Sequence, residues 1–285
     1  MIILDGSMGN ELLKRTNKPS SGLWSAQFLI DSPNLVKEVH QAYVDVGAQV
    51  ITTNTYSTIP SYLQKENKAI LMKDLIRKAG AIAREVADKN DQEILVAGSL
   101  PPLDESYRPD LVPNDKDSIP IYEELIDELN SFVDIFLCET VSSIAETSNV
   151  LKALKNKAKH DTKIWLSWTL LEDKSGRLRS KETIEDAFQF AESFYPDAYL
   201  FNCTDPKAIT EGIKKLSKLT DKPIGCYPNV FGVPFDWTLD NDVQVEPRNL
   251  SVKQFVEYKN LWKDLGASII GGCCGIGPDY IKAIS

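Results

Sequence analysis

Three cysteines lie in two short segments whose composition and position suit metal binding. Cys203 belongs to FNCTDP at positions 201–206, and Cys273 and Cys274 are adjacent in GGCCGIGP at positions 271–278. Each segment follows an apolar run that predicts a β-strand, so each cysteine comes where a strand ends and a loop begins. Adjacent side chains point to opposite sides of an extended strand, and the flanking glycines permit a backbone turn around the pair.

The three thiols predict a catalytic zinc site. Zinc binds thiolates, and three thiolates without a fourth protein ligand leave one coordination position open, which distinguishes a catalytic site from a closed structural one. The alternatives are ordinary buried cysteines and a thiol-redox role for the pair Cys273 and Cys274. A disulfide between these two neighbours is sterically awkward. Cys138 and Cys226 lie in predicted strands without comparable surroundings, and we interpret them as core residues.

The elements that must position these cysteines alternate between strand and helix along the chain. Short apolar runs predict eight strands, and stretches with apolar residues every three or four positions predict helices between them. The predicted strands are 2–4, 50–53, 94–97, 133–137, 164–168, 198–201, 223–227 and 268–270. The predicted helices are 35–46, 63–88, 121–130, 144–157, 183–194, 206–219 and 252–265.

This alternation favours a (β/α)8 barrel that residues 1–285 form as a single domain, although an open doubly wound sheet shares the same local pattern. The segment 5–10 after the first strand lacks the G-x-G-x-x-G spacing of a dinucleotide site. In a barrel, the carboxyl ends of the strands face one pocket, where the cysteines would meet. The long connection 100–120 is expected to form a loop that covers one rim of the barrel.

Composition narrows the class of binding partner. The 285 residues carry a net charge of −9 with a pI near 4.9, which disfavours binding to nucleic acid or to anionic membranes. The apolar run before Asp5 is too short for a signal peptide or a membrane span, so the five cysteines are expected to be reduced thiols or metal ligands. We therefore expect a cytoplasmic protein that binds small molecules. The sequence defines no oligomeric state.

Several segments together resemble the homocysteine S-methyltransferase family. In the order of that family, they are LDGSMGNEL (4–12), LWSAQFLIDSPNLVKEVHQAYVDVGAQVITTNTY (23–56), CET (138–140), FNC (201–203), YPN (227–229) and GGCCG (271–275). The resemblance implies a (β/α)8 barrel and a Zn²⁺ ion held by Cys203, Cys273 and Cys274. It also implies transfer of a methyl group to the thiol of homocysteine, which gives methionine.

A zinc-thiolate centre suits this chemistry. A free thiol has a pKa of about 8.5 and is mostly protonated at neutral pH, whereas binding to zinc removes the proton. The nucleophile is then the zinc-bound substrate thiolate, with no protein nucleophile and no obligatory general base. Four thiolates around zinc carry a net charge of about −2, which attracts a cationic sulfonium donor.

The resemblance also suggests which residues bind homocysteine. Asp5 and Glu139 follow predicted strands and match family positions that bind the ammonium group, although a carboxylate at a strand end can also cap a helix. Thr53, with the backbone around Gly6 and Ser7, is expected to hold the substrate carboxylate. Threonine in a strand is also a common β-former.

The aromatic candidates for the donor site begin with Trp24. It lies in LWSA, where a family aromatic packs near the cationic centre of the donor, and an indole face attracts such a cation. Tyr56, Trp168 and Tyr227 are further candidates of the same kind. The alternative for each is a place in the hydrophobic core.

Four further polar residues are expected to have supporting positions. Asn202 and Asn229 lie beside strand ends and could orient a zinc ligand or a loop, a place that turn-forming asparagines also occupy. His40 and His160 are far from the cysteine motifs in the sequence. We expect both histidines to be surface or packing residues.

Two departures from the family pattern concern the methyl donor. Betaine-using relatives have an aromatic residue after the glutamate of the CET-like segment, where this chain has Thr140, so betaine is the alternative rather than the expected donor. Users of S-methylmethionine or S-adenosylmethionine resemble this chain in LWSA and YPN. Their GPYG-like loop is replaced by Leu100, Pro101 and Pro102 after Ser99, which leaves the choice between these donors open.

The chain length bears on the kind of methyl donor. A chain of 285 residues has no room for the folate and cobalamin domains of large methionine synthases, so a free-standing donor is expected. Selenohomocysteine is a second possible acceptor, because a zinc-thiolate site would not readily exclude it. A zinc-binding or small-molecule-binding barrel without catalytic activity is the competing hypothesis from a different class of protein.

Overall fold

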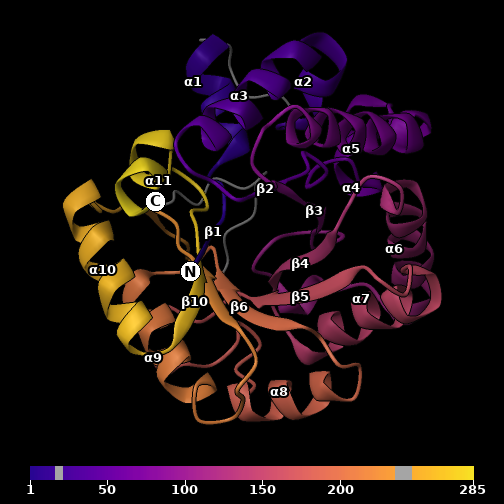
Figure 1. Cartoon of the computed structure of the whole chain (residues 1–285). Coiled ribbons are helices and arrows are strands. Elements are labelled where there is room, and N and C mark those ends of the chain that lie inside the picture. Colours follow the sequence, from indigo (N-terminus) through magenta and orange to yellow (C-terminus); the bar gives the residue numbers. More distant parts are fainter. Residues whose placement is uncertain (17–21, 235–245) are drawn as a thin grey trace.

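The computed structural model describes residues 1–16, 22–234 and 246–285, which form a ring of parallel strands surrounded by helices (Figure 1). The strands of the ring pair in the order β1 (Ile2–Ile3), β10 (Ala267–Ile270), β7 (Ile224–Tyr227), β6 (Ala198–Asn202), β5 (Lys163–Trp168), β4 (Ile135–Val141), β3 (Leu95–Leu100) and β2 (Val50–Thr52). Leu4 after β1 bridges Val50 of β2 in parallel, and the Asp5 N–H donates to the Val50 carbonyl at 3.0 Å. The two ends of this order therefore meet, which confirms the (β/α)8 barrel and excludes an open sheet.

Helices cover the outside of the ring (Figure 1). In chain order they are α1 (Met8–Thr16), α2 (Ala26–Asp31), α3 (Pro33–Asp45), α4 (Pro60–Leu63), α5 (Met72–Asp88), α6 (Asp115–Leu129), α7 (Ile144–Lys157), α8 (Ile184–Glu192), α9 (Pro206–Leu216), α10 (Val252–Asp264) and α11 (Pro278–Ile284). The remaining elements are 3-10 helices at Gln64–Glu66, Ala69–Leu71 and Pro109–Leu111, and the antiparallel pair β8 (Phe231–Gly232) and β9 (Glu246–Pro247). Within the described ranges, every helix is too short or too polar to cross a membrane.

The connection between β6 and α9 shows how the sequence keeps a strand-end side chain in place. The Asp205 side chain accepts a hydrogen bond from the Lys207 N–H at 2.6 Å, and Pro206 presets the first turn of α9. The helix therefore begins four residues after the strand ends at Asn202. Cys203, which directly follows the strand, has little freedom to move.

The predicted helix at 63–88 is wrong in its first third. α4 ends at Leu63, two 3-10 turns follow, and α5 begins at Met72. Asn67 has a left-handed backbone conformation (φ 55°), which ends the first 3-10 turn because an α-helix does not continue through it. Asparagine tolerates this conformation better than most residues, and apolar periodicity does not reveal it.

The predicted loop at 100–120 is shorter than expected. α6 begins at Asp115, where the Asn114 side chain accepts hydrogen bonds from two backbone N–H groups of the first turn at 3.0 and 3.3 Å. The sequence analysis predicted a helix only at 121–130, and a proline in a helix interior removes a helical hydrogen bond. The structure instead accommodates Pro120 inside the helix.

Two apolar layers lie on opposite faces of the barrel strands. The interior layer consists of side chains from the strands and their ends: Leu4, Val50, Ala97, Ile135, Leu137, Trp165, Ala198, Leu200, Tyr227 and Ile269. A larger layer lies between the strands and the helices, and it includes the fully buried thiols Cys138 and Cys226. These two cysteines are core residues, as the sequence predicted.

His40 on α3 is a buried histidine, which agrees with the expected packing role. Its side chain is fully buried, and neither ring nitrogen has a hydrogen-bond partner within residues 1–16, 22–234 and 246–285. Burial lowers its pKa from 6.5 to about 3. Between these two values, the unfolded chain binds a proton that the folded chain does not bind, so stability falls as the pH falls.

We expect His40→Leu to raise the free energy of unfolding, and to do so more at pH 5 than at pH 8. Below the unfolded pKa of 6.5, His40 costs the wild type about 1.4 kcal/mol per pH unit, or about 2 kcal/mol at pH 5. Urea unfolding of both proteins at the two pH values measures this difference. An equal gain at pH 5 and pH 8 would contradict the assignment.

Candidate functional site

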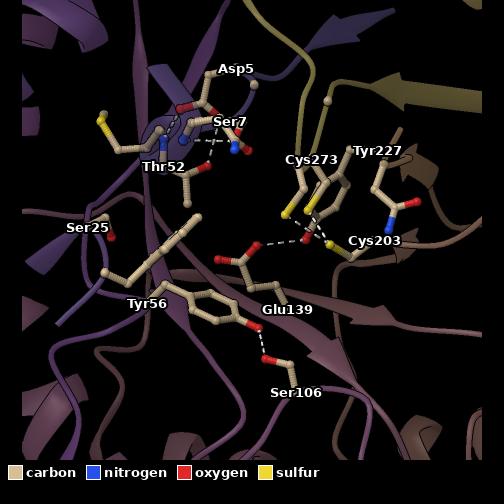
Figure 2. A pocket seen from close by; sticks show the side chains of 18 of the residues that line it. Asp5, Ser7, Ser25, Thr52, Tyr56, Ser106, Glu139, Cys203, Tyr227 and Cys273 are labelled. Carbon is tan, nitrogen blue, oxygen red and sulfur yellow. Dashed lines mark hydrogen bonds between the residues drawn. The ribbon is translucent and has the colours of Figure 1, made fainter. Parts of the chain in front are cut away.

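A cavity of about 370 Å³ lies at the carboxyl ends of the barrel strands (Figure 2). Active sites of (β/α)8 barrels occupy this end. The cavity brings together most of the site residues that the sequence predicted: Asp5, Gly6, Trp24, Thr53, Tyr56, Glu139, Cys203, Tyr227, Asn229, Cys273 and Cys274. Asn202 and Trp168 do not line it.

The three cysteines meet on one wall of the cavity. The Cys203 Sγ lies 2.6 Å from the Cys273 Sγ and 3.7 Å from the Cys274 Sγ, and all three sulfur atoms lie within 4.8 Å of one another. Backbone hydrogen bonds fix these positions, because the Cys203 N–H donates to the Tyr227 carbonyl at 3.1 Å and the Cys273 N–H to the Pro228 carbonyl at 2.8 Å. The ladder that joins β6, β7 and β10 thus continues past the strand ends and sets the sulfur separation.

Two glycines make the turn around the adjacent pair possible. A Cβ added to Gly272 would lie 2.1 Å from the Ile276 side chain, and one added to Gly275 would lie 2.1 Å from the Val230 side chain. Gly275 also has a φ of 80°, in the left-handed region that favours glycine. Cys203 itself adopts a left-handed conformation with a φ of 50°, which turns the chain sharply after β6.

The three thiols are hydrogen bonded to one another through Cys203. Hydrogen bonds from Cys273 and then Cys274 hold the pKa of the Cys203 thiol well below its usual range, and donation to Cys203 raises the pKa of both other thiols. Two S–H groups therefore favour the thiolate form of Cys203. A thiophilic divalent cation fits this set, because it could take the place of the thiol protons and bind all three sulfur atoms.

Two buried carboxyl groups face the same cavity (Figure 2). The Ser99 hydroxyl donates to Glu139 Oε1, and the Tyr227 hydroxyl donates to Oε2 at 3.5 Å. Thr52 donates its backbone N–H to Asp5 Oδ2 at 2.7 Å and its hydroxyl to Oδ1 at 3.0 Å. Burial raises the pKa of each carboxyl group to about 7, although these hydrogen bonds act in the opposite direction. A cation that enters the cavity would favour the ionised carboxylates.

Thr53 lines the cavity, but its donors are already used. Its backbone N–H donates to the Ala97 carbonyl at 2.8 Å, and its hydroxyl accepts the Ser99 N–H at 3.0 Å. The Thr55 hydroxyl donates to the Ser99 carbonyl at 2.8 Å, so the Thr53 hydroxyl must donate its own proton to Thr55, also at 2.8 Å. In this arrangement the Thr53 hydroxyl is bonded within the protein, and its expected contact with the substrate carboxylate stays a prediction.

Three of the four aromatic candidates lie on the cavity wall. Trp24, Tyr56 and Tyr227 all line it, and Trp24 is half-buried with a left-handed φ of 47°. The Tyr56 hydroxyl lies 2.6 Å from the Ser106 hydroxyl, which joins this ring to the loop between β3 and α6 (Figure 2). These rings provide aromatic surface and hydroxyl groups beside the thiols.

Trp168 lies outside the cavity, and its prediction as a donor-binding residue is wrong. It is fully buried, stacks on Tyr199 with ring centroids 5.4 Å apart, and donates its indole N–H to the Thr147 hydroxyl at 3.1 Å. Side chains alternate along a strand, and Trp165, three positions earlier on β5, points into the barrel. Trp168 therefore points outward, to the helices.

The two asparagines support loops at the rim. The Asn202 Oδ1 accepts the Thr140 N–H at 2.8 Å and the Ser167 hydroxyl at 2.7 Å, and its Nδ2 donates to the Thr140 hydroxyl at 2.8 Å. It thereby fixes the residue that follows Glu139. Asn229 lines the cavity, and its Oδ1 accepts a hydrogen bond from Arg248 at 3.4 Å.

The sequence analysis missed residues that the loop between β3 and α6 contributes. Ser106 and Tyr107 line the cavity, and the Tyr107 hydroxyl donates to the Cys203 Sγ at 2.9 Å. The length of the segment 100–120 predicted a loop over the rim, but no feature of its composition singled out Tyr107.

Together, the fold and the site define a class of protein. A (β/α)8 barrel that gathers three thiols and two buried carboxyl groups at the carboxyl ends of its strands is an enzyme scaffold suited to a thiophilic metal ion and a charged small molecule. The family model for homocysteine S-methyltransferase matches residues 2–285, and the chain belongs to this family. The enzyme class expected from the sequence, a homocysteine methyltransferase, is confirmed.

Individual relatives agree with this assignment over most of their length. Homocysteine S-methyltransferase 1 of Arabidopsis thaliana is 28% identical, over 99% of this chain and 92% of its own. Homocysteine S-methyltransferase YbgG of Bacillus subtilis is 27% identical, over 100% of this chain and 93% of its own. The metallated form of the homocysteine methyltransferase MmuM from Escherichia coli has 26% identity and a TM-score of 0.82, over 100% of this chain and 95% of its own.

We expect Cys203→Ala to lose both bound metal and methyl transfer, because it removes the sulfur atom that contacts both other thiols. Metal per chain, measured by mass spectrometry after dialysis, should fall close to zero. The matched control is Cys226→Ala, which removes a buried thiol outside the cavity and should retain its metal. A Cys203→Ala protein with one metal ion per chain would contradict the ligand assignment.

Proposed function

We propose that this protein transfers a methyl group from a sulfonium donor, S-methylmethionine or S-adenosylmethionine, to the thiol of homocysteine. A Zn²⁺ ion would be held by Cys203, Cys273 and Cys274. The observation that carries this proposal is that their sulfur atoms lie within 4.8 Å of one another, beside two buried carboxyl groups. When bound, zinc supplies a Lewis acid that lets the substrate thiol lose its proton at neutral pH. Reduced cysteines are required, which supports a cytoplasmic location.

Glu139 and Asp5 would bind the ammonium group of homocysteine. Both carboxyl groups are buried, and burial alone disfavours their charged forms, so an ammonium ion between them gains from two ionised partners in a site of low dielectric constant. The hydrogen bonds from Ser99 and Thr52 hold these carboxyl groups in position. The amino acid is thereby oriented before its sulfur reacts.

The reaction itself is a displacement at the methyl carbon. A bond forms between that carbon and the homocysteine sulfur, the bond from the carbon to the sulfonium sulfur breaks, and its electron pair stays on the donor, which becomes a neutral thioether. The anionic wall of thiols and carboxyl groups attracts the cationic donor, and the faces of Trp24 and Tyr56 favour its positive charge. The charge of the donor disappears during the step, so the neutral product is held less tightly.

Thr140 supports a sulfonium donor over betaine. The family pattern for betaine has an aromatic residue at this position, next to Glu139. Here the backbone N–H and the hydroxyl of Thr140 are both hydrogen bonded to Asn202, and Thr140 does not line the cavity. Its side chain therefore forms no part of the cavity wall that a methyl donor would contact.

A donor panel tests the proposal. Zinc-loaded protein with homocysteine should form methionine with S-methylmethionine or S-adenosylmethionine, and more slowly or not at all with betaine. Chelation should abolish the activity and added zinc should restore it, whereas a redox role of Cys273 and Cys274 predicts activity that survives chelation. No methionine from any of the three donors would refute the proposal.

We expect Glu139→Gln to raise the KM for homocysteine about 10- to 100-fold, because a buried charged hydrogen bond is worth about 1.5–3 kcal/mol. In the wild type, kcat/KM for homocysteine should fall as the pH drops through about 7, because Glu139 and Asp5 become protonated and neutral. Metal content is measured at each pH to separate this effect from metal loss.

The matched control is Glu146→Gln. Glu146 on α7 is also buried and also has a pKa raised to about 7 by burial, but it does not line the cavity. Its substitution should leave the KM for homocysteine unchanged. An unchanged KM in Glu139→Gln, or an equal rise in both variants, would count against the ammonium-binding role.

A further inference from the structure

The loop between β3 and α6 brings one side chain into contact with the cysteines. The Tyr107 hydroxyl donates a hydrogen bond to the Cys203 Sγ at 2.9 Å, and the ring is buried in the cavity wall with 5% of its surface exposed. Tyr107 has a φ of 67°, a left-handed conformation that non-glycine residues rarely adopt. Such strain persists only where the surrounding structure holds the residue, and it is common at functional sites.

A buried arginine lies against the face of the Tyr107 ring. The guanidinium carbon of Arg179 is 5.1 Å from the ring centroid, and the arginine is only 2% exposed. Its Nη1 donates to the Val233 carbonyl at 3.1 Å, and its Nη2 lies 3.7 Å from Glu172 Oε1. Its Nε and Nη2 make no hydrogen bond to the part of the chain that the structure describes.

The nearest carboxylate is shared between two arginines. Arg248 forms an ion pair with Glu172, and its Nε lies 3.3 Å from Asp205 Oδ2. Glu172 therefore balances the charge of Arg179 only in part, and a buried cation is costly unless it is well paired. The negative face of the Tyr107 ring is a further favourable partner for Arg179, and a cation over that face withdraws electron density from the phenol.

We propose that Tyr107 and Arg179 are positioning residues that tune Cys203 as a metal ligand, Tyr107 through its hydrogen bond to the sulfur and Arg179 through the face of the Tyr107 ring. The inference rests on the metal site of the proposed function. Three cysteine thiolates exceed the charge of a divalent cation by one unit, and a substrate thiolate adds another. A hydrogen bond and a nearby positive charge offset this excess where it is greatest, on the buried Cys203.

Metal binding by Tyr107→Phe tests the first half of this proposal. We expect the affinity for Zn²⁺, measured by competition with a chelator, to fall about 10- to 100-fold, as is typical when a hydrogen bond to a metal ligand is lost. In Co²⁺-loaded protein, the thiolate-to-cobalt charge-transfer band should move to longer wavelength, because a thiolate without its hydrogen bond gives up an electron more easily. Wild-type affinity and an unmoved band in Tyr107→Phe would overturn the proposal.

Tyr56→Phe is the matched control. Its hydroxyl lies in the same cavity but is bonded to the Ser106 hydroxyl rather than to sulfur. Zinc affinity and the cobalt band should remain those of the wild type. Equal changes in Tyr56→Phe and Tyr107→Phe would show a general effect of lost hydroxyl groups and would refute a specific role for Tyr107.

Arg179→Met tests the second half, because methionine fills a similar space without charge. Zinc affinity and the cobalt band should change in the same direction as in Tyr107→Phe, and by less. The double variant should behave as Tyr107→Phe alone, since Arg179 acts through the hydroxyl that this variant lacks. Additive effects would contradict that route. If Arg179→Met does not fold, Arg179→Gln, which also removes the charge but keeps a polar side chain, provides the same comparison.

These measurements are independent of the methyl donor. If the wild type forms no methionine, the proposed function is refuted. The metal affinities and cobalt spectra still test the role of Tyr107 in that case. Methionine formation with a Tyr107→Phe protein that binds zinc as tightly as the wild type would refute the inference and leave the proposed function standing.

Discussion

The hydrogen-bonded ladder around the barrel, continued past the strand ends, is the constraint on which the site depends. The Cys203 N–H bonds to Tyr227 and the Cys273 N–H to Pro228, while the Gly272 N–H bonds to the Asp5 carbonyl at 2.9 Å. These bonds join the ends of β6, β7, β10 and β1 into one rigid rim. Sulfur atoms that are about 70 residues apart in the sequence therefore meet without a disulfide or a long loop to hold them.

The electrostatic character of the cavity follows from this geometry. Three thiols and the carboxyl groups of Asp5 and Glu139 line one small space, and all five groups are neutral or negative. Burial keeps the carboxyl groups partly protonated near neutral pH, because their pKa values are raised to about 7. Such a cavity favours a divalent cation, an ammonium group and a sulfonium group over any anionic ligand. The preference for cationic partners is thus a property of the groups that the fold brings together.

Much of this arrangement could be predicted from the sequence, because short apolar runs locate strands and barrel strands end at one face. Cys203 and Cys273 were placed together by their positions at strand ends, whereas Asp5 and Glu139 were added through the family resemblance, and all four line the cavity. Trp168 shows the limit, since the face on which a strand residue lies depends on register, which a fully buried apolar run does not reveal.

Tyr107 and Thr53 could not be assigned from the sequence for a different reason. The position of Tyr107 depends on the path of a loop that tertiary contacts hold, including a left-handed residue and a buried arginine distant in the sequence. Thr53 depends on a chain of hydrogen bonds through Thr55 and Ser99, which decides whether its hydroxyl has a proton to donate. Both properties arise only when the whole rim is assembled.

The most direct test of the account is X-ray absorption spectroscopy at the zinc edge of zinc-loaded protein, with and without homocysteine. The structure predicts three sulfur ligands from the protein at about 2.3 Å, and a fourth sulfur ligand at a similar distance when homocysteine is added. A zinc ion with fewer than three sulfur ligands, or a sulfur count that does not rise with homocysteine, would contradict it.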